Sequence, residues 1–153
     1  MNISDYLKNP LTGEKILLYA MQAIDENKEQ LKRYQIKQWD DGVNKENKTI
    51  GVYKLNTEVI SLGRKKAGQA YNLKDSGDFR NKTKISEKKL VKDVAIVIDS
   101  LSNNTDDLFN TIIRYGLIKD PNTVFGFTKK NISLVKQLIY KSIRQKIKQN
   151  HGI

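Results

Sequence analysis

The sequence has 153 residues, of which 38% are hydrophobic and 29% charged, and these values indicate one folded domain with a moderate core and much polar surface. It contains no cysteine and a single histidine, His151, close to the carboxyl end. Disulfides and thiolate zinc sites are therefore excluded, and a histidine-based metal site or catalytic base is not expected. The amino terminus has no long apolar run of the kind that predicts a signal peptide or a membrane span, so we expect a protein made in the cytoplasm.

The formal net charge of +11 is concentrated in two segments. Residues 63–92 carry a net charge of +7, and residues 121–153 carry +7 without a single acidic residue, whereas residues 93–120 carry −3. Blocks of one sign are typical of contact with a polyanion or with a complementary protein surface. A solvated basic face is an equally good interpretation of either basic block alone.

The first third of the chain predicts an arm followed by a long helix. Residues 1–13 are expected to form an N-terminal arm, because Pro10 disfavours a helix that runs through it. An amphipathic helix is predicted over residues 14–38, with Asn27 and Lys28 interrupting its apolar stripe and Gly42 beyond its end. We interpret the stripe as core packing; it consists of Leu17, Ala20, Ile24, Leu31 and Tyr34.

Two polar loops flank a short helix in the next segment. Residues 41–54 are predicted to form a loop, and a helix over residues 58–62 follows, capped by Asn56 or Thr57 and stopped by Gly63. The loop after this helix is basic and includes Arg64, Lys65 and Lys66.

The clearest turn signal in the chain is Asp75-Ser76-Gly77, because Asp and Ser bond their own backbone and Gly accepts a positive φ. Strands are predicted over residues 78–85 and 93–100, and an antiparallel hairpin is their simplest arrangement. We interpret five residues as a structural turn that leads into the first strand, with the last of them buried: Leu73, Asp75, Ser76, Gly77 and Phe79.

The last third of the chain predicts two helices. The first begins at a Thr105 cap and runs to Tyr115, with Gly116 just past its end. The second covers residues 129–149 after a Thr128 cap, and its apolar stripe needs a partner, for which the helix over residues 14–38 is the obvious candidate. The remaining tail, residues 150–153, is expected to be frayed and to include His151.

Together these elements predict an α+β fold. A long N-terminal helix and a basic C-terminal helix are expected to pack on a small antiparallel sheet with long loops. The predicted organisation is an arm over residues 1–13, a single domain over residues 14–149 and a tail over residues 150–153.

Motifs of enzyme chemistry are missing from the sequence. It has no P-loop, no Gly-x-Ser-x-Gly elbow, no His-Glu-x-x-His motif and no closely spaced carboxylate cluster. Ser76 lacks a positioned base that would make it a nucleophile, and Asp93 and Asp99 are about 20 Å apart if the strand between them is extended. We therefore expect a protein without catalytic residues, metal or cofactor.

A series of short motifs occurs in a fixed order over about residues 38–149. They are Trp39…Gly42, Ile50-Gly51-x-Tyr53, Lys65/Lys66…Gly68, Leu73-x-Asp75-Ser76-Gly77-Asp78-Phe79 and Tyr115-Gly116…Val124-Phe125-Gly126-Phe127-Thr128-Lys129-x-Asn131. This succession resembles small structural proteins of tailed bacteriophages, in the tail-completion or head–tail joining class, of the kind found in phages of Bacteroides-type bacteria, including crAss-like phages. Two features depart from that pattern: Ser76 stands where Thr is commoner, and the terminal helix is unusually basic.

The resemblance implies a non-enzymatic subunit of the virion neck or tail that is made in the host cytoplasm. Such a subunit would form a homo-oligomeric ring of about six or twelve copies around the DNA path. It would contact the portal or adjacent neck and tail proteins, with non-specific contact to genomic DNA and no contact with a membrane. The alternative is a stand-alone basic nucleic-acid-binding protein, and a small nuclease is a third interpretation that lacks its metal-ligand cluster.

The basic residues that suit contact with a neighbouring subunit or with DNA lie in two groups. The first group is in the loop after the short helix, and the second is on the terminal helix. They are Arg64, Lys65, Lys66, Lys141, Arg144 and Lys148. For the terminal helix we expect pairing with acidic patches of a neighbour that weakens with salt, while DNA and plain solvent remain open as the other candidates.

Overall fold

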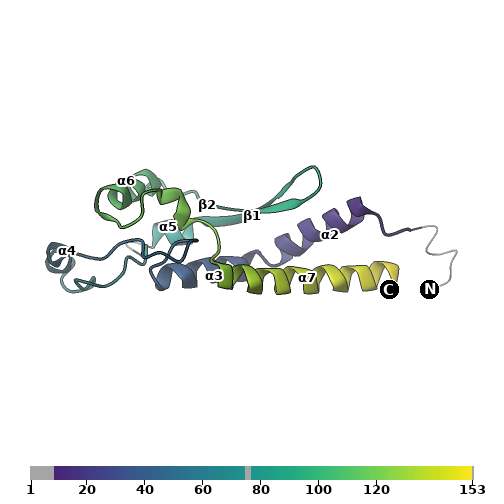
Figure 1. Cartoon of the computed structure of the whole chain (residues 1–153), viewed down its shortest axis with the longest axis horizontal. Coiled ribbons are helices and arrows are strands. Elements are labelled where there is room, and N and C mark those ends of the chain that lie inside the picture. Colours follow the sequence, from purple (N-terminus) through teal and green to yellow (C-terminus); the bar gives the residue numbers. More distant parts are fainter. Residues whose placement is uncertain (1–8, 75–76, 153) are drawn as a thin grey trace. The chain divides into compact units, whose positions relative to one another are not determined.

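The computed structural model describes residues 9–74 and 77–152, and Figure 1 shows the order of their elements. The strands β1 (Thr83–Lys89) and β2 (Val94–Ser100) form a two-stranded antiparallel sheet. The helices are α2 (Gly13–Glu26), α3 (Lys28–Asp40), α4 (Leu55–Ile60), α5 (Asp78–Asn81), α6 (Thr105–Tyr115), the 3-10 helix η1 (Pro121–Val124) and α7 (Lys129–His151). This content confirms the predicted α+β class, the hairpin and the terminal helix.

The described residues divide into two compact units. Unit 1 contains residues 9–31, 85–97 and 133–152, and unit 2 contains residues 32–74, 77–84 and 98–132. The sequence analysis expected a single domain over residues 14–149.

The predicted helix over residues 14–38 is wrong in one respect, because it is two helices with a break at Asn27. The side-chain amide of Asn27 donates to the carbonyl oxygen of Ala23 at 2.7 Å and to the hydroxyl of Ser142 at 3.0 Å. The backbone N–H of Asn27 donates to the carbonyl oxygen of Ile24, three residues earlier, and not to that of Ala23, four residues earlier. An asparagine side chain that competes for the carbonyl four residues earlier disrupts the helical ladder there, so α2 ends and α3 starts anew.

In unit 1, α2 and α7 lie side by side (Figure 1) and are joined by polar contacts along their length. Lys146 of α7 forms an ion pair with Glu26 of α2, and Ser142 accepts from Asn27 at the end of α2. Val135 and Ile139 are the buried apolar residues of α7. These contacts confirm the expected pairing of the terminal helix with the N-terminal helix.

The expectation that His151 is frayed is wrong. The ring is fully buried, its Nδ1 lies 2.9 Å from the carbonyl oxygen of Asn9, and its Nε2 lies 2.9 Å from the hydroxyl of Tyr19. Because a carbonyl can only accept, Nδ1 donates to the carbonyl of Asn9, and in the neutral ring Nε2 then accepts from Tyr19. Helix α7 runs two residues beyond the predicted end at Gln149, which brings His151 onto the apolar side of the helix, four residues after Ile147.

The predicted strand over residues 78–85 is wrong in its first half, where the short helix α5 stands. Gly77 has a φ of 84° and precedes α5, and Asp78 is an acidic residue in the first turn, where the positive helix end favours it. The strand begins at Thr83, whose hydroxyl donates to the carbonyl of Phe79 at 2.9 Å. Leu73 also has a positive φ, 54°, and both it and Phe79 are buried as members of the core. The predicted turn residues Asp75 and Ser76 lie outside the described residues.

Gly77→Val is expected to lower the free energy of unfolding by about 1–3 kcal/mol, because a β-branched side chain resists a left-handed backbone. Space is not the cause, since a Cβ at Gly77 would lie 3.5 Å from the nearest side-chain atom. Denaturant unfolding measures the effect. The control is Gly13→Val at the start of α2, where φ is not positive and no atom lies within 4 Å. If the two variants had equal free energies of unfolding, the left-handed backbone at Gly77 would not contribute to the stability of the protein.

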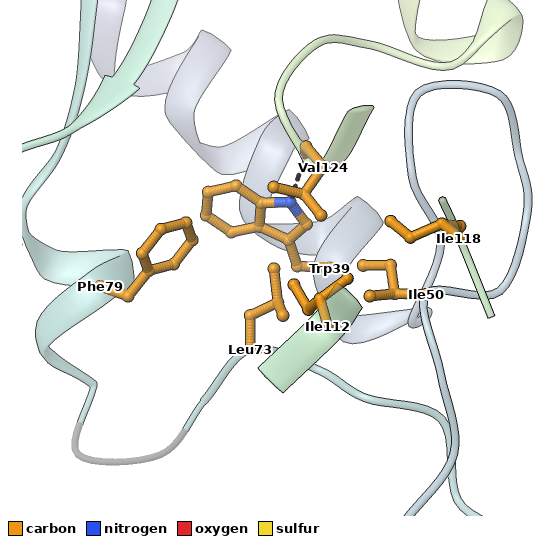
Figure 2. Close-up of a cluster of buried hydrophobic side chains, with 7 residues drawn as sticks. All are labelled: Trp39, Ile50, Leu73, Phe79, Ile112, Ile118 and Val124. Atoms are coloured by element: carbon orange, nitrogen blue, oxygen red, sulfur yellow. Dashed lines mark hydrogen bonds between the residues drawn. The ribbon is translucent and has the colours of Figure 1, made fainter. Parts of the chain in front are cut away.

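The core of unit 2 is built around Trp39 of α3, which is fully buried (Figure 2). Its indole N–H donates to the carbonyl oxygen of Val124 at 2.8 Å. Its ring centroid lies 5.2 Å from that of Phe79 and 6.2 Å from that of Phe125. The buried apolar cluster comprises Trp39, Ile50, Leu73, Phe79, Ile112, Ile118 and Val124.

Two buried glutamines of α3 hold the segment that precedes α7. Gln35 donates to the carbonyl of Val124 at 3.2 Å and accepts from the N–H of Gly126 at 3.0 Å. Gln38 donates to the carbonyl of Gly126 at 3.0 Å and accepts from the N–H of Thr128 at 2.9 Å. The side-chain amides thus replace a neighbouring strand as hydrogen-bond partners of this segment. Thr128 in turn caps α7, as predicted.

Helix α6 has the predicted bounds but not the predicted cap. Asn104 is its N-cap residue, and the hydroxyl of Thr105 donates to the carbonyl of Ser102 instead of capping the helix. Gly116 follows the helix with a negative φ, which any residue can adopt, so glycine is not needed there for its backbone conformation. It is needed because other backbone atoms lie close to it. A Cβ there would lie 2.5 Å from the carbonyl oxygen of Ile112 and 2.8 Å from that of Ile50, which only glycine avoids.

Candidate functional site

A closed loop of unit 2, residues 53–69, carries helix α4 and is named the α4 loop here. Val52 and Ala70 form an antiparallel bridge at its base. Within the loop, the backbone N–H of Tyr53 donates to the carbonyl of Gln69 at 2.9 Å. The two ends are therefore fixed by backbone hydrogen bonds, and the loop is a defined part of the fold.

Helix α4 begins earlier than predicted. The backbone of Lys54 is extended and the helix starts at Leu55, so the predicted caps Asn56 and Thr57 lie inside its first turn. The prediction of a helix over residues 58–62 was wrong because it depended on a side-chain cap, and α4 has none. Gly63, predicted to stop the helix, lies beyond its end with a φ of 77°.

The three basic residues predicted for contacts in this loop bond within it. The Nε of Arg64 donates to the carbonyl of Ser61 at 3.0 Å, and the N–H of Lys65 donates to the hydroxyl of Ser61 at 3.0 Å. The Nζ of Lys66 forms an ion pair with Glu58 at 3.7 Å. The side chains of Arg64 and Lys66 therefore stabilise the turn after α4, whereas Lys65 does so through its backbone N–H.

Helix α4 buries none of its residues and exposes large apolar side chains. Leu55 and Val59 are each 66% exposed, Ile60 is 82% exposed and Leu62, just after the helix, is 90% exposed. Leu62 also has a φ of 52°, which is costly for a leucine and is followed by the positive φ of Gly63. Several large apolar side chains exposed on one short, closed loop are typical of an interaction site.

A pocket of about 810 Å³ lies beside the α4 loop, wholly within unit 2. Its apolar part is shared with the core and its walls come from the α4 loop, the chain around Tyr71 and helix α6. The lining residues are Tyr53, Lys54, Asn56, Thr57, Lys65, Tyr71, Leu73, Lys74, Gly77, Phe79, Asn104, Asp107, Leu108, Thr111, Ile112 and Tyr115.

One wall of the pocket is a pair of tyrosines. The ring centroids of Tyr53 and Tyr71 are 4.8 Å apart, and the hydroxyl of Tyr53 donates to the side chain of Asn72 at 3.3 Å. Burial, and then the neighbouring phenol of Tyr53, raise the pKa of Tyr71 above its ordinary value. A Cβ at Gly51 would lie 2.4 Å from the ring of Tyr71, so glycine is required for this ring to lie against the backbone.

The charges at the pocket are mainly positive. The Nζ of Lys54 lies 5.1 Å from the ring centroid of Tyr115, and the Nζ of Lys65 lies 5.5 Å from that of Tyr53. Lys74 adds a third cation and Asp107 a single carboxylate. Ammonium groups over aromatic faces gain cation–π attraction. The pocket can therefore receive an apolar group that carries negative charge.

The motif residues singled out in the sequence gather in unit 2. Trp39, Ile50 and Phe79 belong to its core, Gly51 lies under Tyr71, and residues 124–128 are held by the glutamines of α3. The ordered motifs therefore contribute to the packing of one unit. What sequence reasoning missed was the exposure of α4, because a helix of six residues is too short for a burial pattern to show, and no burial was predicted for it.

The second group of predicted contact residues lies in unit 1. Lys141, Arg144 and Lys148 are exposed on α7. They border a shallow depression of about 460 Å³ along the helix, together with Gln137, Tyr140 and Gln145. The structure therefore assigns the two predicted groups of basic residues to different units.

Two other kinds of site were sought in residues 9–74 and 77–152. In these residues no three or more His, Asp or Glu side chains are close enough to hold a metal ion. No helix of the same residues is long and apolar enough to cross a bilayer. No protein-family model, curated protein or solved structure matches this chain.

Proposed function

We propose that this protein is a structural subunit of the neck or tail of a tailed bacteriophage, and that its copies assemble into a ring that joins the head, at the portal, to the tail around the DNA path. The observation that carries the proposal is the apolar surface of the α4 loop. The phage class is supported by the ordered motifs over about residues 38–149, and assembly is supported by the exposed side chains. The protein would be made in the host cytoplasm and reside in the virion.

The α4 surface is large enough to matter energetically. Leu55, Val59, Ile60 and Leu62 are each two-thirds exposed or more. Complete burial of one such side chain contributes about 1.5–3 kcal/mol. Closed rings repeat a contact in every copy, so a modest interface of this kind can hold an assembly together. The adjoining pocket, with its apolar floor, adds surface that a neighbouring subunit or a portal protein can fill.

The assembly is tested by measuring mass in solution. We expect the wild-type protein to form a closed oligomer by size exclusion with light scattering, and Val59→Gln with Ile60→Gln to shift it to monomers. The substituted side chains make no buried contact, so the melting temperature of the monomer should stay the same. The matched control is Leu90→Gln with Val91→Gln, two exposed apolar residues of unit 1, which should assemble as the wild type does.

Two results would contradict this proposal. One is a wild-type protein that remains monomeric at every concentration and in the presence of the virion proteins next to it. The other is assembly by the α4 variant that equals assembly by the hairpin control, since the oligomer would then use another surface.

The second candidate function is a stand-alone basic nucleic-acid-binding protein. The observation that favours it is the +7 charge of residues 121–153, which contain no acidic residue. A monomer that binds duplex DNA and never assembles would support this function over the ring subunit.

A further inference from the structure

We infer that the outward side of α7 is a binding surface for the phosphate backbone of duplex DNA. This surface, named the basic face of α7 here, consists of Lys141, Arg144 and Lys148 together with Tyr140, Gln137 and Gln145. The inference deepens the proposed function by naming the surface that faces DNA, and it rests on that function for the choice of DNA over other polyanions.

The cations of the basic face lie on one side of the helix. Lys141, Arg144 and Lys148 follow one another at steps of three and four residues, which place side chains on one side of a helix. The buried residues Val135 and Ile139 are on the other side, and the third buried residue of α7, His151, lies three residues after Lys148 at the end of this surface. The seven helical steps from Lys141 to Lys148 rise about 10.5 Å, and duplex DNA carries one charge per about 1.7 Å of its axis. Several phosphates can therefore face these three cations at once.

The basic face has no compensating charge of its own. Among the described residues, Lys146 of α7 is ion-paired with Glu26, whereas Lys141, Arg144 and Lys148 have neither an ion pair nor a side-chain hydrogen bond. Like charges on neighbouring turns repel each other. Binding of a polyanion removes this repulsion and releases the counterions that were condensed on the polyanion. This release is the main source of affinity in non-specific DNA binding.

Residue types favour DNA over a protein partner at this surface. The cores of protein–protein interfaces are depleted of charged residues, lysine among them, and are more apolar than the rest of the surface, as the α4 surface is. The basic face instead offers cations, glutamine amides and the hydroxyl of Tyr140, whose side chain is 56% exposed. These are the groups that donate to phosphate oxygens. Because phosphate contacts do not read bases, binding should be independent of DNA sequence.

The test is fluorescence anisotropy of the full-length protein with two unrelated duplexes of equal length. We expect equal affinity for both duplexes. If this surface makes three phosphate contacts, they alone should lower the affinity for DNA by about 40-fold between about 50 and about 200 mM salt. Lys141→Gln, Arg144→Gln and Lys148→Gln together should weaken binding at least about tenfold and reduce the slope of log K against log salt by about 3. The control, Lys84→Gln with Lys88→Gln and Lys89→Gln, removes the same charge from exposed lysines of β1 and should change affinity less than about threefold.

Three outcomes would overturn the inference. They are absence of DNA binding, equal losses in the α7 and β1 variants, and tighter binding of polyglutamate than of DNA, which would indicate an acidic protein surface as the partner. Assembly is measured separately by light scattering without DNA. A ring that forms without binding DNA contradicts this inference alone, and a monomer that binds DNA contradicts the proposed ring alone.

Discussion

Trp39→Ala is expected to lower the free energy of unfolding by about 3–5 kcal/mol, a large share of the about 5–15 kcal/mol that stabilises a typical domain. The indole is fully buried, and its removal leaves a cavity between Phe79 and Phe125. It also leaves the carbonyl of Val124 without its 2.8 Å donor. Denaturant unfolding followed by circular dichroism measures the loss, because Trp39 is the sole tryptophan and fluorescence disappears with it.

Trp39→Phe separates the two parts of this effect. Phenylalanine keeps most of the apolar volume but cannot donate to the carbonyl of Val124, so we expect a loss of about 1–3 kcal/mol, clearly smaller than for alanine. Equal stability of the alanine variant and the wild type would mean that unit 2 does not depend on this core.

The core and the candidate pocket are coupled through shared residues. Leu73, Phe79 and Ile112 belong to the buried cluster and also line the pocket. A variant that loosens the cluster should therefore distort the pocket before it unfolds the protein. We expect Trp39→Phe to weaken assembly more than its melting temperature suggests, if the pocket contributes to the proposed contact between copies.

Elements with a clear period were predictable from the sequence. Helix α6, helix α7 and strand β2 lie where the 3.6-residue and two-residue patterns placed them, because each depends on regular burial. Helix α5 escaped prediction because it is a single turn, too short to show a helical period. The break at Asn27 is visible in the sequence only as a polar interruption, and it arises from one side-chain hydrogen bond that a pattern does not reveal.

Burial of polar residues was the main feature beyond prediction. Gln35, Gln38 and His151 are at most 2% exposed, because each has partners that are far away in the sequence. Hydrophobic patterns count such residues as solvent-facing. For the apolar residues of α4 no burial was predicted at all, and they are exposed. The candidate site was therefore predictable in its basic residues and motif glycines, and not in its apolar surface.

Gln38→Met is expected to lower the free energy of unfolding by about 2–4 kcal/mol, because it keeps the length of the side chain and removes its hydrogen bonds. In the wild type the amide of Gln38 donates to the carbonyl of Gly126 and accepts from the N–H of Thr128 at 2.9 Å and from the side chain of Asn131 at 3.2 Å. Methionine would leave the buried N–H of Thr128 and the half-buried carbonyl of Gly126 without these partners, and an unpaired buried group costs about 1–3 kcal/mol.

The matched control for Gln38→Met is Gln22→Met, the same substitution at an exposed position of α2. It should change the free energy of unfolding by less than about 0.5 kcal/mol. Hydrogen exchange gives a local measurement of the same effect, since the amide proton of Thr128 is protected by Gln38 and should exchange faster in the Gln38 variant. If Thr128 stays protected and the two variants unfold alike, the segment before α7 is held by its own backbone conformation, and the glutamines of α3 contribute little to it.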